Sequence, residues 1–572
     1  MTDATGTTDG TATIEGSGPT DAVGDSERHG GELAAAVARR HGVDTMFTLS
    51  GAHVFPLYDA AVKGVPQLRL IDVRHEQTAV FAAEAVGKLT RAPGLAVLTA
   101  GPGVTNGVSG ITTAYFNGSP LVVIGGRAPE WRWGTGSLQE LDHPPILAPV
   151  TKHAGTIREV SQIANRVDEA FALAATPHRG PVFLDVPMDH LYSRTRVGLP
   201  PAPSRTPVSP DPDALADIAE ALATAHRPVL VLGSDVWADR AEDAARRTAE
   251  ELGIPVITNG MGRGVLPAGH ELLVTRARAQ AFGRADLVVV AGAPLDFRLG
   301  FGSFGGKDGR PPARVVHLAD ADSQLATHVD LAASAAGDLG AILGGLLAAW
   351  AQQLRTPSWT EWLSTLQQQA KAATDADRAL LESAVEPIHP ARIYGELIRR
   401  LADDAVVVGD GGDFVSFAGK YVEPSRPGGW LDPGPYGCLG TGLGYAIAAR
   451  LARPSAQVVL LLGDGAAGFS LMDVDTLVRH RLPVVMVVGN NSCWGLEKHP
   501  MQFLYGYDVV AELGVQTRYD EVVRALGGAG ELVTAPDEIG PALDRAFASG
   551  VPYLVNVVTD PSVVYPRTTT GI

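Results

Sequence analysis

Two apolar segments near the end of the chain lead into polar residues that suit the binding of cations and phosphates. QVVLLL at 457–462 is followed by GDG, with Asp464 at its centre, and VVMVV at 484–488 is followed by GNN, which ends at Asn491. In an open α/β sheet such residues lie at the carboxyl ends of the strands, where ligands bind. Mg²⁺ prefers oxygen ligands and takes some of them from bound phosphates. The pattern predicts a magnesium and diphosphate site.

The predicted metal ligands are the side chains of Asp464 and Asn491 and the backbone carbonyl of Cys493. The two glycines beside Asp464 let phosphates approach the backbone, and a helix that we expect to begin near Gly468 offers free N–H groups. Taken separately, GDG is explained as a turn and the double asparagine as a helix cap. Their combination after successive strand-like segments favours the ligand site.

The elements that must position these residues alternate along the whole chain. Short β-branched segments alternate with amphipathic helical runs, which is typical of doubly wound parallel sheets. A proline- and serine-rich stretch at 191–214 and a polar, helix-forming stretch at 352–390 interrupt this alternation. We therefore expect an α/β protein with three doubly wound parallel-sheet domains. The expected divisions are a disordered tail, a first domain, a central domain and a last domain, at 1–28, 29–195, 212–352 and 388–572.

Strand candidates occur in each of the three blocks. They are MFTLS, LRLID, LAVLTA, LVVIGG and VFLDVP in the first block, RPVLVLG, PVITN, ADLVVVAG and RVVHLA in the second, and DAVVVGDGG, QVVLLLGDG, PVVMVVGNN and PYLVNVV in the third.

Composition narrows the class of partner. The net charge of −17 argues against nucleic acid or an anionic membrane as the main partner. No apolar run reaches the roughly 18 to 20 residues of a membrane helix, and the N-terminus lacks the pattern of a signal peptide. The two cysteines, Cys438 and Cys493, provide neither a disulfide framework nor a four-thiolate zinc site. We expect a cytoplasmic protein.

The GDG and NN motifs, separated by 24 residues, resemble the signature of thiamine diphosphate enzymes. In that family a glutamate activates the cofactor, and its ylid is formed by chemistry that belongs to the cofactor. Glu76 in LIDVRHEQTAV matches this glutamate, although an acid there is also explained by the helix dipole. GPYGCLGTGLGYAIAA at 434–449 resembles the family's stretch between the two cofactor rings. The implied cofactor-binding residues are Glu76, Gly437, Leu439, Gly463, Asp464, Gly465 and Asn491.

The resemblance covers residues of about 30–560 and has a consequence for assembly. In this family the cofactor lies between the pyrimidine-binding domain of one chain and the diphosphate-binding domain of another. The resemblance therefore implies a homodimer or homotetramer that binds thiamine diphosphate and Mg²⁺. A degenerate homologue with a regulatory or scaffold role is the alternative, and the presence of Glu76, Asp464 and Asn491 argues against it.

Within the family the chain is similar to the group of acetolactate synthases, oxalyl-CoA decarboxylases and 2-hydroxyacyl-CoA lyases. GAHVFPLYD departs from acetolactate synthases because His53 stands where they have small residues, which adds a group that exchanges protons near neutral pH. We therefore predict a lyase that splits a 2-hydroxyacyl-CoA into formyl-CoA and an aldehyde or ketone, with acetolactate synthase as the alternative. The implied catalytic residues are Glu76, His53, Gln139 and Glu497.

The central block resembles a nucleotide-binding domain of the same group. The segment at 274–302 is similar to one that binds an adenine diphosphate, and the match places Arg278 on the phosphates of ADP or coenzyme A, with Asp296 in the same segment. Asp320 and Asp322 follow the strand RVVHLA and are expected to hold a ribose. Acetolactate synthases use this domain for FAD, which remains the alternative. The C-terminal tail, YPRTTTGI, is either a lid or a frayed end.

Overall fold

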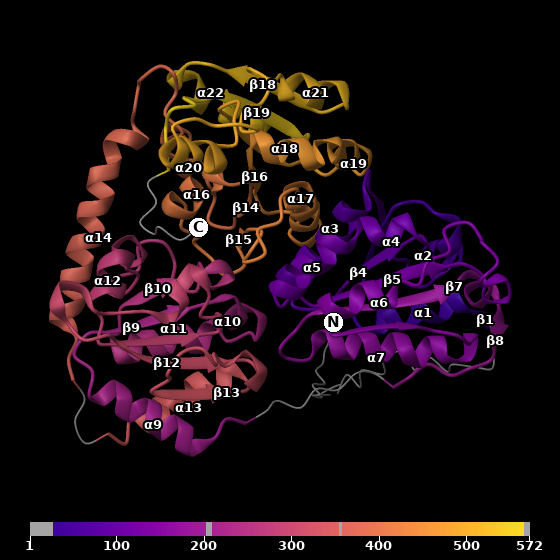
Figure 1. Ribbon diagram of the computed structural model, residues 1–572, viewed down its shortest axis with the longest axis horizontal. Helices are drawn as coiled ribbons and strands as arrows, with labels where there is room; N and C mark the ends of the chain where they lie inside the picture. The colour runs from indigo at the N-terminus through magenta and orange to yellow at the C-terminus, as the bar shows by residue number, and fades with distance from the viewer. Residues whose placement is uncertain (1–26, 202–208, 354–356, 566–572) are drawn as a thin grey trace, which may run out of the picture.

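Figure 1 shows a computed structural model in which three parallel sheets, each flanked by helices, form three domains. The structure describes residues 27–201, 209–353 and 357–565. The predicted tail lies outside these residues except for its last two positions, and the second of these, Arg28, starts a strand. The last seven residues of the chain, where we predicted a lid or a frayed end, also lie outside them. The expected fold class is confirmed.

The first sheet has six parallel strands in the order β3-β2-β4-β5-β7-β6. Every strand predicted for this block forms. The unpredicted strand is β6, whose residues HAGT have no apolar run, and it lies at the edge of the sheet. The strands are β2 Thr45–Thr48, β3 Arg69–Asp72, β4 Gly94–Leu98, β5 Leu121–Arg127, β6 His153–Thr156 and β7 Pro181–Pro187.

The central sheet has five parallel strands in the order β10-β9-β11-β12-β13, and the edge strand β13 was not predicted. The last sheet has six in the order β15-β14-β16-β17-β19-β18, with unpredicted strands at both edges. The strands are β9 Pro228–Leu232, β10 Val256–Thr258, β11 Leu287–Ala291, β12 Arg314–Ala319, β13 Ala333–Ala336, β14 Val406–Asp410, β15 Trp430–Leu431, β16 Val458–Gly463, β17 Val485–Asn490, β18 Ala529–Val533 and β19 Tyr553–Val558. A short antiparallel pair joins β1 Arg28–His29 to β8 Arg194–Thr195.

Helices cover both faces of the sheets (Figure 1). Those of the first domain are α1 Gly30–Arg40, α2 Phe55–Lys63, α3 Glu76–Thr90, α4 Pro102–Asn106, α5 Val108–Phe116, α6 Pro144–Leu147, α7 Ile163–Ala175 and α8 Met188–Tyr192. Those of the central domain are α9 Pro212–Ala223, α10 Ser234–Ala238, α11 Glu242–Leu252, α12 Arg278–Arg284 and α13 Leu339–Trp350. The last domain contains α15 Ala391–Ile398, α16 Asp413–Tyr421, α17 Thr441–Ala452, α18 Asp464–Ser470, α19 Val474–Arg479, α20 Gly495–Tyr505, α21 Tyr519–Ala525 and α22 Ile539–Ala548.

Helices α3 and α17 pack together and join the first domain to the last. A Cβ atom at Gly444 would lie 2.7 Å from the Cβ of Phe81, so the close approach depends on glycine at this position. The rings of Phe81 and Tyr445 meet edge to face with centroids 6.2 Å apart. The Tyr445 hydroxyl donates to Glu84 Oε2 at 2.8 Å. One hydrophobic core therefore extends through both domains.

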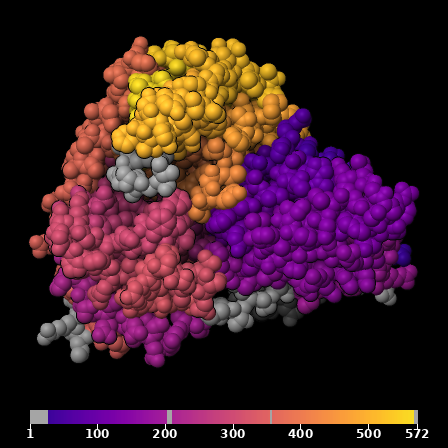
Figure 2. All heavy atoms as spheres, viewed as in Figure 1, coloured from indigo at the N-terminus to yellow at the C-terminus, as the bar shows by residue number. Residues whose placement is uncertain are grey.

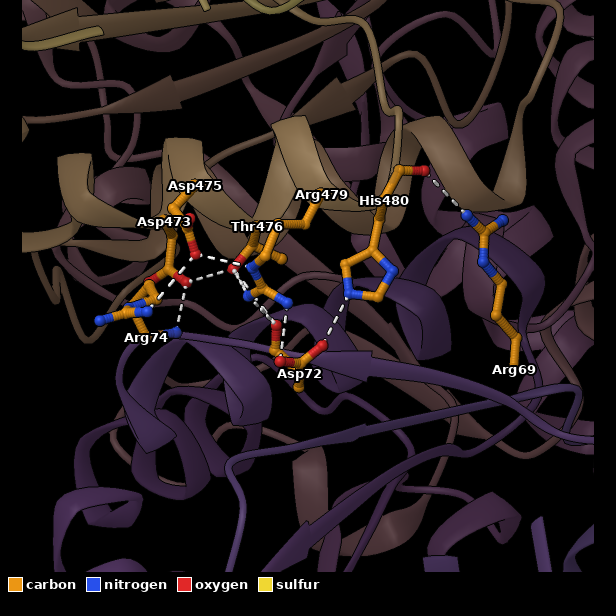
Figure 3. Close-up of polar contacts among 8 residues, drawn as sticks. All are labelled: Arg69, Asp72, Arg74, Asp473, Asp475, Thr476, Arg479 and His480. Carbon is orange, nitrogen blue, oxygen red and sulfur yellow. Dashed lines mark hydrogen bonds and ion pairs between the residues drawn. The ribbon is translucent and has the colours of Figure 1, made fainter. Parts of the chain in front are cut away.

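A polar junction lies beside this core, between the end of β3 and helix α19 (Figure 3). Asp72 accepts hydrogen bonds from Arg479 Nη1 at 2.7 Å and from His480 Nε2 at 2.9 Å. Arg69 donates to the backbone carbonyl of His480 at 3.3 Å. Because Asp72 and Arg479 are partly exposed, each contact contributes little stability. Together they set how α19 lies on the first domain.

Helix α14, Thr360–Leu381, connects the central domain to the last domain. It lies within the polar stretch that we predicted to be helix-forming. Trp362 Nε1 donates to the Pro228 carbonyl at 3.0 Å, and Leu366 is buried against the central domain. Figure 2 shows all three domains in contact on the viewed face. None of the helices in the described ranges is long and apolar enough to cross a membrane.

Candidate active site

The loop after β16 holds the first predicted ligand. The backbone at Gly463 is extended, and α18 begins at Asp464 rather than near Gly468, so the helix start predicted there is wrong by four residues. The Asp464 side chain is buried, and its oxygens accept hydrogen bonds from the N–H groups of Gly465 at 2.9 Å and Ser492 at 2.7 Å. The carboxylate thus links the loops that follow β16 and β17.

The charge of Asp464 is only partly compensated. Burial raises the pKa of its carboxyl to about 6, although the backbone N–H groups of Gly465, Ser492 and Cys493 act against the shift. A carboxylate with a raised pKa and no cation beside it gains stability when a cation binds. This position therefore fits a divalent ion, whose charge would keep Asp464 ionised.

The two neighbouring asparagines differ in their surroundings: the Asn490 side chain is bonded within the protein, whereas the Asn491 side chain is available to a ligand. Asn490 is buried and donates to Asn556 Oδ1 at 3.1 Å and to the Thr517 carbonyl at 3.0 Å. Asn491 is partly exposed, and its Oδ1 accepts from the Cys493 N–H at 3.2 Å. Burial raises the pKa of the Cys493 thiol to about 11, so the thiol stays protonated and the residue offers its carbonyl. The structure brings Asp464, Asn491 and Cys493 together.

Glycines shape the surface around these ligands. A Cβ atom at Gly465 would lie 2.4 Å from the Trp494 ring, so only glycine lets this indole pack against the loop. Gly411 follows β14 with φ of +124° and approaches the backbone of Gly463. Sequence reasoning did not single out Gly411, although GDGG at 409–412 repeats the glycine-rich pattern. Backbone at both strand ends is thus accessible to a phosphate group.

A cleft of about 640 Å³ opens beside this loop, between the central and last domains. Gly437, with φ of +68°, and Leu496 line the cleft from the last domain. Leu439 lies two residues after Gly437 in the sequence, and its carbonyl accepts a hydrogen bond from Gln77 Nε2 at 3.4 Å. Arg298 lines the cleft from the central domain, with its guanidinium paired to Asp296 at 2.7 Å. Sequence reasoning did not single out Arg298.

Glu76 is the first residue of α3 and is buried. Its Oε2 accepts a hydrogen bond from Asn106 Nδ2 at 3.0 Å, and its Oε1 lies 3.6 Å from the position of a Cβ atom added at Gly103. His75 caps the helix by accepting from the Gln77 N–H at 3.2 Å. Among the described residues, no hydrogen bond joins the Glu76 side chain to the last domain. Its carboxylate therefore stays at the carboxyl edge of the first sheet.

His53 lies at the same edge, in a short 3-10 helix at Ala52–Val54. Its side chain is buried, with Nδ1 3.1 Å from Thr99 Oγ1. Burial lowers the pKa of this imidazole and the nearby His143 adds to the effect, against a hydrogen bond with the backbone of Leu138. His53 is therefore a neutral imidazole at pH 7, able to accept a proton.

Gln139 completes this edge of the first domain. It has φ of +61° and packs on Gly101, where an added Cβ atom would lie 2.9 Å from the Gln139 Cβ. His143 holds the two loops together, because its Nε2 accepts from the Gly101 N–H at 2.9 Å and its Nδ1 lies 2.9 Å from Asp185 Oδ2. Arg127 donates to the same carboxylate at 2.8 Å. Sequence reasoning missed His143 and Arg127, whose partners are distant in sequence.

Glu497 lies on a helix of the last domain. Glu497 is exposed on α20, and the carboxylate has no hydrogen bond or ion pair in the ranges that the structure describes. The neighbouring Lys498 pairs instead with Glu512.

The residues predicted to hold a nucleotide form two groups. Arg278 lines the cleft between the central and last domains and donates to the backbone carbonyl of Arg298. Asp296 forms its ion pair with the Arg298 side chain. Asp320 is buried and lies 3.0 Å from His178 Nδ1, whereas Asp322 is exposed. Arg278 and Asp296 thus lie together around Arg298, and Asp320 lies beside His178.

Three α/β domains that carry acidic, amide and glycine residues at their strand ends are typical of enzymes that bind a cofactor. Three family profiles match the chain in order. They describe the thiamine pyrophosphate enzyme N-terminal TPP binding domain, central domain and C-terminal TPP binding domain, at residues 28–146, 215–346 and 410–557. The chain belongs to the thiamine pyrophosphate enzyme family.

Relatives with two activities align along most of the chain. The acetolactate synthase large subunit IlvG of Mycobacterium tuberculosis is 52% identical over 543 residues, covering 94% of this chain and 97% of that protein. The 2-hydroxyacyl-CoA lyase 2 of Danio rerio is 35% identical and covers 90% of this chain and 88% of that protein. The human 2-hydroxyacyl-CoA lyase 2 is 33% identical, with coverage of 93% and 90%. The comparisons favour acetolactate synthase over the lyase that we predicted first.

Proposed function

We propose that the chain is an acetolactate synthase that depends on thiamine diphosphate and Mg²⁺, decarboxylates a 2-oxo acid and joins the remaining fragment to a second 2-oxo acid. The observation that carries the proposal is the 52% identity with the IlvG protein over nearly the full length of both chains. The lyases are 33% and 35% identical over a similar span. The higher identity supports the activity that we had placed second.

The proposed cofactor site uses residues from two domains. Asp464, Asn491 and the carbonyl of Cys493 would hold Mg²⁺, and the glycine-rich strand ends would receive the diphosphate. When bound, thiamine diphosphate supplies the nucleophilic carbon and stabilises the negative charge that develops on the substrate. Glu76 would hold a proton at the aminopyrimidine ring, and Gly437 would accept a hydrogen bond through its carbonyl. In a homodimer or homotetramer, Glu76 would serve the cofactor that a second chain holds.

The cleft beside Gly437 supports a substrate that carries a carboxylate. Arg298 lies in its wall, and the Asp296 side chain holds the guanidinium in place through hydrogen bonds of 2.7 to 3.1 Å. An arginine N–H group donates a strong charge-assisted hydrogen bond to a carboxylate. We infer that Nη1 of Arg298, which is not one of the atoms bonded to Asp296, orients the carboxylate of a 2-oxo acid in this cleft.

A 2-hydroxyacyl-CoA lyase remains the second candidate because of His53. The buried imidazole has a lowered pKa and lies 3.1 Å from the Thr99 hydroxyl, so it is neutral and able to take a proton from a substrate hydroxyl. Cleavage of a 2-hydroxyacyl-CoA needs such a base, and decarboxylation of a 2-oxo acid does not.

Two parallel assays with the full chain, thiamine diphosphate and Mg²⁺ separate the candidates. Acetolactate formed from pyruvate supports the first, and formyl-CoA formed from a short 2-hydroxyacyl-CoA without any acetolactate would overturn it. His53→Ala should lower formyl-CoA formation by about 100-fold if the lyase activity is present. His226→Ala, which changes an exposed histidine, is the matched control and should leave both rates unchanged.

A further inference from the structure

A second cleft, of about 900 Å³, lies between the first and central domains. The carboxyl ends of the central strands β9, β10 and β11 form one wall, through Asp235, Asn259 and Gly292. Residues Lys152 and His178 of the first domain form part of the other. None of the residues lining it is a proposed ligand of Mg²⁺, since those come from the last domain. The cleft is therefore separate from the metal site described above.

The cations that line this cleft already have partners. Arg179 pairs with Asp239 at 2.6 Å and with Asp320 at 3.5 Å. The ammonium group of Lys152 donates to three backbone carbonyls of the first domain at 2.7 to 2.8 Å. His178 Nδ1 lies 3.0 Å from Asp320 Oδ1. Each of these groups thus already has a hydrogen-bond or ion-pair partner within the protein.

Asp235 is a negative charge that His178 and Arg179 compensate only in part. Asp235 is 8% exposed. Its backbone N–H donates to the Gly292 carbonyl at 3.0 Å, and this hydrogen bond fixes Asp235 just after the end of β9. The carboxylate has no hydrogen-bond donor and no ion-pair partner in the part of the chain that the structure describes. Burial raises the pKa of this carboxyl to about 7, and the charge of Asp320 acts in the same direction. A buried carboxylate of this kind is destabilising unless a cation or a donor reaches it.

We propose that His178, Asp235 and Asp320 form a binding site for a divalent transition-metal cation, such as Zn²⁺ or Mn²⁺, between the first and central domains. A ring nitrogen of His178 and one oxygen of each carboxylate all lie within 4.8 Å of one another. One imidazole nitrogen with two carboxylate oxygens is a donor set that suits these ions. The cation supplies the positive charge that Asp235 lacks.

Binding requires His178 to release a proton. Burial acts to lower the pKa of this imidazole, and the charges of Asp235 and Asp320 outweigh it and raise that pKa. The ion therefore replaces the proton that now lies between His178 and Asp320, and a ring nitrogen becomes a ligand. Asp320 keeps its contact with Arg179 through its second oxygen, at 3.5 Å.

The site also bears on the nucleotide that we expected in the central domain. A diphosphate at the carboxyl ends of these strands would come close to the charge of Asp235, which its neighbours compensate only in part, and like charges repel. This end of the cleft is consequently suited to a cation and unsuited to the diphosphate of FAD, ADP or coenzyme A.

Cation binding to the full-length Asp464→Asn variant, without thiamine diphosphate, tests the proposal. This background removes the other candidate metal site, and calorimetric titration with Zn²⁺ and separately with Mn²⁺ gives the number of ions per chain. We expect one ion per chain for at least one of the two metals, with an affinity that falls by at least about tenfold when Asp235→Asn is added. Asp322→Asn, at an exposed acid two residues after Asp320, is the matched control and should leave binding unchanged.

Two results would overturn the proposal. One is the absence of stoichiometric binding of either metal to the Asp464→Asn protein, and the other is equal binding with and without Asp235→Asn. Asn has nearly the shape of Asp and removes a buried charge, so the protein should fold. If it does not, His178→Gln in the same background tests a second ligand and should cause the same loss. The readout is bound metal, so the result is independent of the proposed activity.

Discussion

The Asp473 carboxylate of the last domain accepts a hydrogen bond of 2.6 Å from the Thr78 hydroxyl on helix α3 of the first domain. The same carboxylate accepts from the backbone N–H of Arg74 at 2.8 Å (Figure 3). Arg74 and Thr78 lie on either side of Glu76 in the sequence. The buried Asp473 of the last domain therefore holds in place the segment of the first domain that contains Glu76, the proposed activating acid.

Thr78→Val should therefore lower the free energy of unfolding by about 2 kcal/mol, because it removes a donor from a buried acceptor while keeping the side-chain shape. Thr90→Val, on the same helix, is the matched control, since the Thr90 hydroxyl is exposed and donates to the carbonyl one turn earlier. Its effect should stay within about 0.5 kcal/mol. Denaturant unfolding of both variants measures the difference, and equal effects would contradict the role of Asp473.

Glu76→Gln should lower turnover by at least about 100-fold while thiamine diphosphate still binds, because the amide keeps the shape but cannot hold the proton. The matched control is Glu84→Gln, a second buried glutamate on α3, which accepts from Tyr445 and Asn117 away from the cofactor site. That variant should retain turnover within a few-fold. Steady-state assays measure the turnover of both variants, and calorimetry measures their binding of thiamine diphosphate. Undiminished turnover of Glu76→Gln would exclude the proposed mechanism.

The two neighbouring asparagines should respond oppositely to the same substitution. Asn491→Ser should weaken Mg²⁺-dependent binding of thiamine diphosphate by about tenfold or more, with little change in melting temperature. Asn490→Ser should instead lower the melting temperature, because it removes buried hydrogen bonds to Asn556 and Thr517. Calorimetry in the presence and absence of EDTA, together with thermal unfolding, measures both. If both variants lose affinity alike, Asn491 is not the distinguishing ligand.

Asp410 should make the stability of the cofactor-free protein depend on pH. It is buried at the end of β14, and burial raises the pKa of its carboxyl to about 7 against the hydrogen bonds that it accepts from Gly442 and Gly440. The native state therefore binds a proton that the unfolded state releases above its lower pKa, so the stabilisation is present in acid and lost as the pH rises through about 7. Relative to Asp410→Asn, the unmodified protein should lose about 3 kcal/mol between about pH 5 and about pH 8. Urea unfolding at several pH values tests this, and parallel pH profiles for the two proteins would refute it.

The buried strands were predictable from sequence because parallel strands covered on both faces are nearly continuous apolar runs. The unpredicted strands β6, β13, β15 and β18 all lie at sheet edges. Three of them, β6, β13 and β18, are less buried and have a weaker apolar pattern, and β15 is buried but only two residues long. In the site, the spacing of Asp464 and Asn491 was informative because each follows a strand of the same sheet. His143 was not predictable, because its role depends on contacts with Gly101 and Asp185, which only the folded chain brings together.

Helix α14 holds the central domain and the last domain at a fixed separation. Its 22 residues span about 33 Å at 1.5 Å per residue, and its Asp377 binds Arg276 of the central domain and Lys420 of the last domain. Because a helix turns by about 100° with each residue, inserting a single residue before Asp377 would rotate this carboxylate away from both partners. Insertions of whole turns would keep its direction but separate the two domains. The width of the cleft that contains Arg298 and Gly437 is therefore tied to a residue count in a segment that does not line it.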